Sequence, residues 1–200
     1  MTAENWALFF HLIGAFLLVC GVAIAGVAGF AGLMQPTVLI AFATKHGSTR
    51  DVATAVAGRL SAHGIVTYTC PAVDVHSLEG YDGVVVGSAI YTGRLHAEAR
   101  DFLHRFRGEL ATCPLAVFAI GPRTLADEDV TGSRRQLDAA LTKEPTLHPF
   151  ATAVFGGVFD PAQHRFPFNR MPASDVRDWA AIRAWANEVA RRFTAVEAAA

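Results

Sequence analysis

The residues best suited to chemistry in this sequence form one short polar turn, made of Thr44, Lys45, His46, Gly47, Ser48 and Thr49. Its hydroxyl groups can hydrogen-bond to anionic oxygens, and Gly47 lets the backbone come close to a ligand. An apolar run at 38–43 precedes the turn, and apolar residues recur at helical spacing over 52–60. A buried strand, a small-residue turn and a helix start together predict a phosphate site, because the free N–H groups and the dipole of the helix attract anions.

The helix after this turn has signals at both ends. Ser48 and Asp51 are spaced as in a capping box, and Gly64 is a plausible stop. Lys45 and Arg50 either neutralise phosphate charge or are simply solvated. His46 either contacts phosphate or lies exposed. The turn matches neither GxxxxGK[ST] nor GxGxxG, so a nucleotide triphosphatase and a dinucleotide fold are not the first interpretation.

Short apolar runs alternate with helical patterns along the rest of the chain. Such alternation, with wholly apolar strands, predicts a doubly wound parallel α/β sheet of five strands in the order 2-1-3-4-5. Ligands of such sheets bind beyond the carboxyl ends of the strands, where strands 1 and 3 diverge. The predicted strands are 38–43, 65–70, 84–86, 115–120 and 152–155, and the later helices are 96–106, 131–141 and one that Asp175 caps, with Trp179 in its buried stripe.

The turn at 44–49 resembles the phosphate loop of the flavodoxin family, T-x-T-G-x-T. Thr44, Gly47 and Thr49 fall on that pattern, and His46 stands where the family usually has threonine. The stretch GSAIYTGRLHAEARDFL at 87–103 is similar to the ring-binding loop of flavodoxin-domain proteins, in particular the branch with the menaquinone-dependent protoporphyrinogen IX dehydrogenases. The resemblance implies a flavodoxin-like fold over 36–195 that binds FMN.

The loops after strands 3 and 4 are then expected to hold the flavin ring. Tyr91 offers a flat face for stacking, and the groups around Thr92 and Gly93 can bond the polar edge of the ring. His96 either moves protons near the ring or is an exposed first-turn residue. The predicted cofactor-binding residues of these loops are Ser88, Ala89, Ile90, Tyr91, Thr92, Gly93, Gly121, Pro122 and Arg123.

The C-terminal part also resembles that branch, with one departure. Phe155-Gly156-Gly157 and Arg177-Asp178-Trp179 flank a loop that contains prolines and aromatic residues. The dehydrogenases of the branch carry a longer, more basic segment here, tied to membrane association and substrate access. In this chain only His164, Arg165 and Arg170 are basic between 160 and 173.

The stretch Trp6 to Leu33 contains no Asp, Glu, Lys or Arg. It exceeds the ~20 residues that a membrane helix needs. The sequence therefore predicts an N-terminal hydrophobic helix within 1–35, and the basic residues after it place the domain in the cytoplasm. The alternative is that the chain naturally begins at Met34 and is cytoplasmic. Residues 196–200 form an alanine-rich tail.

Composition and motifs narrow the function further. The formal charge of −1 argues against a nucleic-acid partner, and the three cysteines form no CxxC pair. The eight histidines show no metal-ligand spacing, so no metal site is predicted. No catalytic residue is identified. The leading hypothesis, implied by the resemblance, is an FMN-dependent dehydrogenase similar to the quinone-linked protoporphyrinogen IX enzymes, which passes electrons to membrane quinone. The alternatives are a non-catalytic electron carrier for a membrane reductase and a protein that kept the fold without the flavin.

Overall fold

The computed structural model describes residues 35–163 and 165–197. The hydrophobic helix predicted within 1–35 and the last residues of the predicted tail lie outside the described part. Among the helices of the described residues, none is both long and apolar enough to span a membrane.

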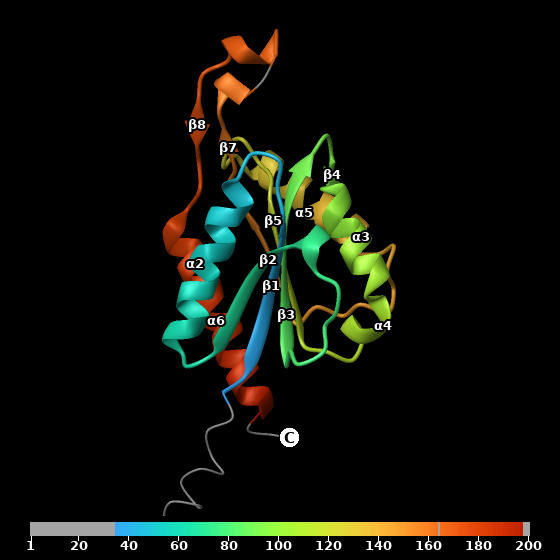
Figure 1. The fold of residues 1–200 in the computed structure, drawn as a ribbon. Helices are drawn as coiled ribbons and strands as arrows, with labels where there is room; N and C mark the ends of the chain where they lie inside the picture. Colours follow the sequence, from blue (N-terminus) through green and yellow to red (C-terminus); the bar gives the residue numbers. More distant parts are fainter. Residues whose placement is uncertain (1–34, 164, 198–200) are drawn as a thin grey trace, which may run out of the picture. The chain divides into compact units, whose positions relative to one another are not determined.

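Five parallel strands form the central sheet, in the order β2-β1-β3-β5-β6 (Figure 1). Because β4 is a short addition at the end of β3, this is the predicted order 2-1-3-4-5, and the doubly wound architecture is confirmed. In the register of β1, Val38 lies between Thr67 and Gly83. The strands are β1 (Thr37–Ala43), β2 (Val66–Pro71), β3 (Gly83–Tyr91), β5 (Leu115–Ile120) and β6 (Ala151–Phe155).

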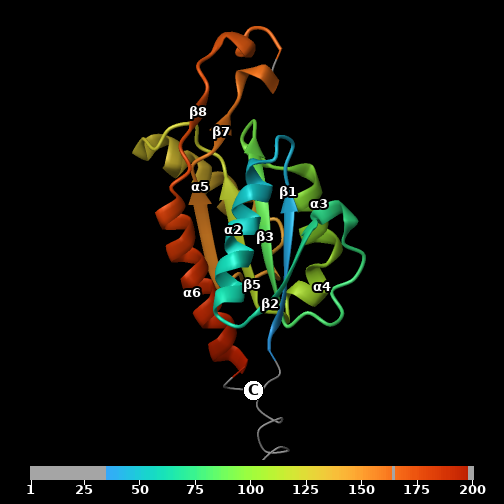
Figure 2. The ribbon, with the colours of Figure 1, turned by 60° about the vertical axis from the view of Figure 1, so that its left-hand side comes forward.

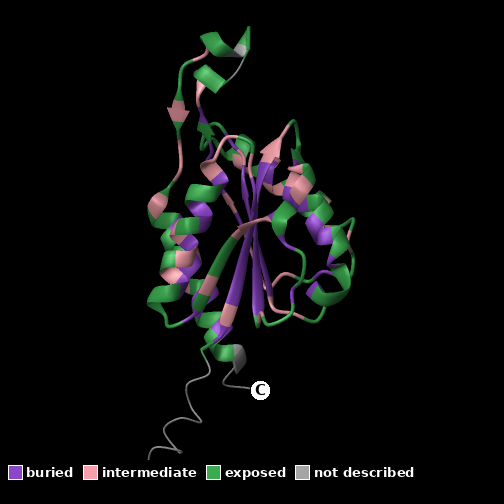
Figure 3. Cartoon of the chain, viewed as in Figure 1, coloured by how far each residue is buried: buried purple, intermediate pink, exposed green. Residues whose placement is uncertain are grey.

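Helices cover both faces of the sheet. Alternate residues of β1 divide between two cores: Ile40 packs toward α2 (Ser48–Ala62) and α6 (Trp179–Glu197), and Leu39 toward the opposite face. Burying one such side chain stabilises the fold by about 1.5–3 kcal/mol. Figure 2 shows α2 and α6 side by side, and Figure 3 shows the buried sheet between exposed helix surfaces. The opposite face is covered by α3 (Ala97–Arg105), α4 (Arg107–Leu110) and α5 (Asp127–Leu141).

Two predicted helix caps are wrong. Gly47, in the left-handed region at φ 90°, is the N-cap of α2, and no side chain caps this helix. The Ser48–Asp51 capping box therefore does not form; Asp51 instead contacts Arg177. Asp178 rather than Asp175 caps α6, because its Oδ1 accepts hydrogen bonds from the N–H groups of the helix's second and third residues, at 2.9 and 3.0 Å.

The third strand is longer than predicted. It runs on through the residues expected as a loop, and with β4 (Arg94–Leu95) it forms a hairpin whose tip is Thr92-Gly93. Thr92 has φ 47° and Gly93 φ 80°, as a type I′ turn requires. A β-branched residue at positive φ is strained by about 1–3 kcal/mol, and such strain is common at functional sites.

The segment between β6 and α6 departs from the sheet and returns as an antiparallel pair, which we call the ribbon (residues 158–175). Its strands are β7 (Val158–Phe159) and β8 (Ser174–Asp175), and it carries two short 3-10 turns, η2 (Pro161–Gln163) and η3 (Phe168–Arg170). The sequence predicted only a loop here. Figures 1 and 2 show the ribbon rising beyond the carboxyl ends of the sheet strands, where ligands of this architecture bind. A third turn, η1 (Ala72–Asp74), follows β2.

Candidate functional site

The polar turn at 44–49 is organised around the start of α2. The N–H of Gly47 donates to Oγ1 of Thr44 at 3.0 Å, and the N–H of Asp51 makes the first helical bond, to the carbonyl oxygen of Gly47 at 3.2 Å. Among the described residues, no acceptor within the protein pairs with the N–H groups of Ser48, Thr49 or Arg50. A helix start with such unsatisfied donors attracts an anion.

Thr49 shows that the turn fits a phosphate group. Its side chain is fully buried, and its Oγ1 has no hydrogen-bond partner within the described structure. A buried hydroxyl left unpaired destabilises a protein by about 1–3 kcal/mol, so such groups normally have a partner. A phosphate oxygen at the adjacent helix start is a chemically matched acceptor for this hydroxyl.

Tyr91 joins two of the three predicted ligand loops, the turn at 44–49 and the loop after the third strand. Its hydroxyl accepts a hydrogen bond from the N–H of Lys45 at 3.3 Å, and its ring makes T-shaped contacts with the rings of His46 and His96, at centroid distances of 6.0 and 5.8 Å. Burial raises the pKa of Tyr91, although hydrogen bonds from the backbone of Lys45 and His46 and from the side chain of Thr44 act in the opposite direction. The phenol therefore stays neutral at physiological pH and positions the turn at 44–49, which we call the phosphate turn. Its predicted stacking on the ring stays a prediction.

Ser88 hydrogen-bonds to the backbone of the β3–β4 hairpin. Its side chain is fully buried, and its Oγ donates to the carbonyl oxygen of Ala89 and accepts from the N–H of His96, both at 3.0 Å. The N–H of His96 also donates to the carbonyl oxygen of Ala89 at 2.8 Å. Ser88 thus holds the β3–β4 hairpin in place, and it does not line the cleft described next.

A cleft of about 1100 Å³ lies at the carboxyl end of the sheet. This volume lies slightly above the range of about 300–1,000 Å³ that is usual for small-molecule and cofactor sites. The three loops predicted from sequence all contribute to it. The predicted residues that line it are His46, Ser48, Ala89, Ile90, Tyr91, Thr92, Gly93, Gly121, Pro122 and Arg123, whereas Thr44, Lys45, Gly47, Thr49 and Ser88 lie outside its lining.

Sequence reasoning missed two walls of the cleft, the amino-terminal half of α5 and the ribbon. Arg123 contacts the ribbon: its guanidinium lies 4.3 Å from the ring centroid of Phe159, and its Nη1 is 3.8 Å from the sulfur of Met171. The position of α5 directly after the fourth-strand loop was the available signal. The missed lining residues include Glu128, Asp129, Gly132, Ser133, Arg135 and Gln136 on α5 and Val158, Phe159, Pro172 and Ser174 on the ribbon.

The remaining candidates lie apart from the cleft lining. Nδ1 of His96 is buried without a hydrogen bond, 3.7 Å from Oε2 of Glu98. Trp179 packs against the core. Cys70 and Cys113 are half-buried free thiols, and burial raises the pKa of both. Within the part of the chain that the structure describes, no cluster of side chains could hold a metal ion.

Comparisons with known proteins show the family of this chain. The flavodoxin domain family matches residues 39–170. Protoporphyrinogen IX dehydrogenase [quinone] of Escherichia coli K12 is 26% identical over 133 residues, which are 64% of this chain and 72% of that enzyme.

Solved structures share the fold. The flavodoxin of Streptococcus pneumoniae TIGR4 has a TM-score of 0.51 at 18% identity and covers 80% of this chain and 98% of its own. The two-electron reduced flavodoxin of Megasphaera elsdenii has a TM-score of 0.53 at 14% identity and covers 77% of this chain and 98% of its own. At such identities the likeness concerns architecture. The family match covers more than half of the chain: the chain belongs to the flavodoxin domain family of FMN-binding oxidoreductases.

Proposed function

We propose that this protein is an FMN-dependent dehydrogenase that oxidises a porphyrinogen-like substrate and passes the electrons to quinone. The observation that carries the proposal is the extent of the cleft. Besides the three flavin loops, α5 and the ribbon line it, which leaves room for a second ligand beside the cofactor. The 26% identity to protoporphyrinogen IX dehydrogenase [quinone] over 72% of that enzyme supports the substrate class.

Each part of the site has a role in this proposal. Thr49 and the free N–H groups at the start of α2 hold the phosphate, and Tyr91 fixes the phosphate turn against the hairpin. Backbone groups of Gly93 and Gly121 face the cleft, where they can bond the polar edge of the ring. Bound FMN supplies the hydride and electron transfer. Arg123 and the ribbon border the space left for the substrate.

Contact with a membrane is part of the proposal. The stretch 6–33 has no Asp, Glu, Lys or Arg, which supports an anchor that keeps the domain at the cytoplasmic face, close to membrane quinone. Cell fractionation of the full chain and of a variant that starts at Met34 tests this. The full chain should sediment with membranes and the shortened one should not; equal distributions would contradict the anchor.

The test of function is an anaerobic assay of the purified full chain loaded with FMN. Protoporphyrinogen IX and a short-chain quinone are added, and porphyrin fluorescence and quinone absorbance are followed together. Porphyrin formation that requires both FMN and quinone supports the proposal. Flavin binding without turnover would refute the dehydrogenase.

An electron carrier is the second candidate. The observation that favours it is that the S. pneumoniae and M. elsdenii flavodoxins align with this chain over 98% of their own lengths. A carrier exchanges electrons only with a partner protein. Reduction of the bound flavin by a flavodoxin reductase, together with no porphyrin formation, would select this function.

A further inference from the structure

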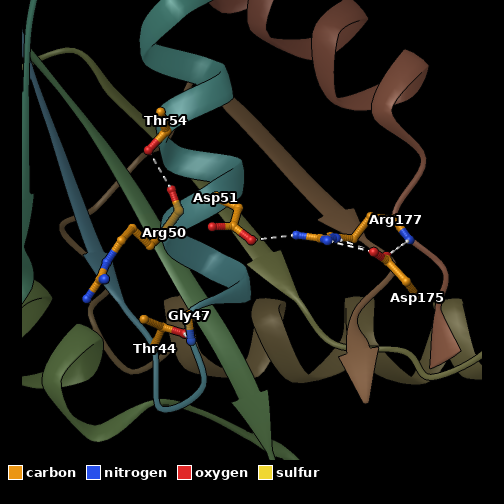
Figure 4. A network of polar contacts seen from close by, with 7 residues as sticks. All are labelled: Thr44, Gly47, Arg50, Asp51, Thr54, Asp175 and Arg177. Carbon is orange, nitrogen blue, oxygen red and sulfur yellow. Dashed lines mark hydrogen bonds and ion pairs between the residues drawn. The ribbon is translucent and has the colours of Figure 1, made fainter. Parts of the chain in front are cut away.

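One arginine connects the ribbon with the helix of the phosphate turn. Arg177 lies between β8 and α6, and its Nη1 donates to Oδ2 of Asp51, in the first turn of α2, at 2.9 Å. Its Nε and Nη2 donate to the two carboxylate oxygens of Asp175 at 2.9 and 2.6 Å. The guanidinium lies 4.8 Å from the ring centroid of Trp179, and the side chain is only 12% exposed. Figure 4 shows this network beside the phosphate turn.

Asp51 carries a negative charge close to a site built for an anion. It follows Ser48 by three residues on α2, which places their Cα atoms about 4.5 Å apart along the helix axis. Charges separated by less than the Debye length of about 8–10 Å interact without strong screening. An unpaired Asp51 carboxylate would therefore oppose a phosphate dianion at the free N–H groups of this turn. Figure 4 shows the side chain of Asp51 directed toward Arg177, on the opposite side of the helix from Arg50.

We propose that Arg177 is a positioning residue of the phosphate site: it holds the Asp51 carboxylate to the side of α2 and offsets part of its charge, so that the helix start accepts a dianion. This inference rests on the proposed FMN function and assigns a role to a residue outside the cleft lining.

Backbone contacts that do not involve the Arg177 side chain also hold this region together. β7 and β8 pair through their backbones, and the N–H of Val176 donates to the carbonyl oxygen of Gly157 at 3.1 Å. The two chain segments are also in close contact here, because a Cβ built on Gly156 would lie 1.9 Å from the carbonyl oxygen of Val176. Substituting Arg177 by glutamine therefore removes the charge while these backbone contacts remain.

The experiment compares the binding of FMN and riboflavin, which differ by the phosphate, to the full-length wild type and to Arg177→Gln at low and high salt. In the variant the dissociation constant for FMN should rise about tenfold at low salt and less at high salt, while that for riboflavin should stay within about twofold. Asp51→Asn added to Arg177→Gln should restore most of the FMN affinity, because the opposing carboxylate is then gone. Arg192→Gln is the matched control: it also removes an arginine from an ion pair, but Arg192 pairs with Glu188 within α6, at 3.4 Å.

The outcomes separate the possibilities. Unchanged FMN binding in Arg177→Gln, or an equal loss of FMN and riboflavin affinity, overturns the proposed role, because a merely structural contact would affect both flavins alike. The role is overturned as well if adding Asp51→Asn restores no FMN affinity. If the wild type binds neither flavin, the proposed cofactor function itself fails, and this role fails with it.

Discussion

Replacing Thr49 by valine should change the stability of the apoprotein and its affinity for FMN in opposite directions. The side chain is fully buried, and its hydroxyl has no partner among the described residues. A buried unpaired hydroxyl destabilises by about 1–3 kcal/mol. Valine has nearly the same shape without the polar group. The free energy of unfolding of apo Thr49→Val should therefore exceed that of the wild type by up to that amount.

FMN affinity should fall because the phosphate loses this hydroxyl. A hydrogen bond to a charged group contributes about 1.5–3 kcal/mol, and 1.4 kcal/mol corresponds to a tenfold change in an equilibrium constant. The dissociation constant of Thr49→Val for FMN should thus be about 10- to 150-fold higher than that of the wild type. Riboflavin, which lacks the phosphate, should bind almost equally well to both.

Urea unfolding of the apoproteins and titration of flavin fluorescence measure the two quantities. Thr54→Val is the matched control, because Thr54 lies on the same helix and its hydroxyl already donates to the carbonyl oxygen of Arg50, at 3.0 Å. This control should leave FMN affinity unchanged. An unaltered dissociation constant for FMN in Thr49→Val, or an apoprotein less stable than the wild type, would refute the reasoning.

Three further predictions concern the turn and the ribbon. Gly47→Ala should lower the free energy of unfolding by about 1–2 kcal/mol, because Gly47 has a φ of 90°. Gly58→Ala should raise the free energy of unfolding by about 0.5–1 kcal/mol, because Gly58 lies inside α2 with open space around it. Thermal unfolding measures both changes, and equal effects would contradict the reasoning. Tyr91→Phe should weaken FMN binding about fivefold through the lost bond from the N–H of Lys45, a loss of about 1 kcal/mol, and an unchanged FMN titration would speak against this link. Hydrogen bonding and ion pairing with Arg177 lower the pKa of Asp175 below the unfolded value of about 3.9. The stabilisation from this pair is therefore complete above that pH and is lost as the pH falls through the lowered folded pKa. Acid unfolding of Asp175→Asn should depend less on pH below about 4, and a profile identical to that of the wild type would exclude the contribution.

The sequence determined the architecture because its signals are local. Apolar runs such as 38–43 are short and β-branched, and helical stripes alternate with them, so a parallel sheet and its strand order follow from general rules. The phosphate turn was visible for the same reason, since strand, turn and helix start are contiguous. The position of the cleft followed from the rule that ligands bind at the carboxyl ends of the strands.

Caps and strand ends were not determined locally. Ser48 and Asp51 have the spacing of a capping box, yet Arg177, 126 positions later in the chain, takes the carboxylate. The third strand was expected to end at Val86 because the following residues look like a loop. It continues to Tyr91 because β5 and the hairpin strand β4 offer it backbone partners.

The side-chain partners within the site were decided by the tertiary structure alone. Tyrosine is a residue type that stacks on flat rings, but only the folded chain brings the hydroxyl of Tyr91 to the N–H of Lys45. Serine is a residue type that often binds ligands, but the buried hydroxyl of Ser88 hydrogen-bonds to the backbone of the hairpin. The sequence by itself determined that three loops meet at the cleft, because periodicity and turn residues act over a few positions. Which polar groups remain available to the cofactor depends on contacts between distant segments, and only the tertiary structure decided that.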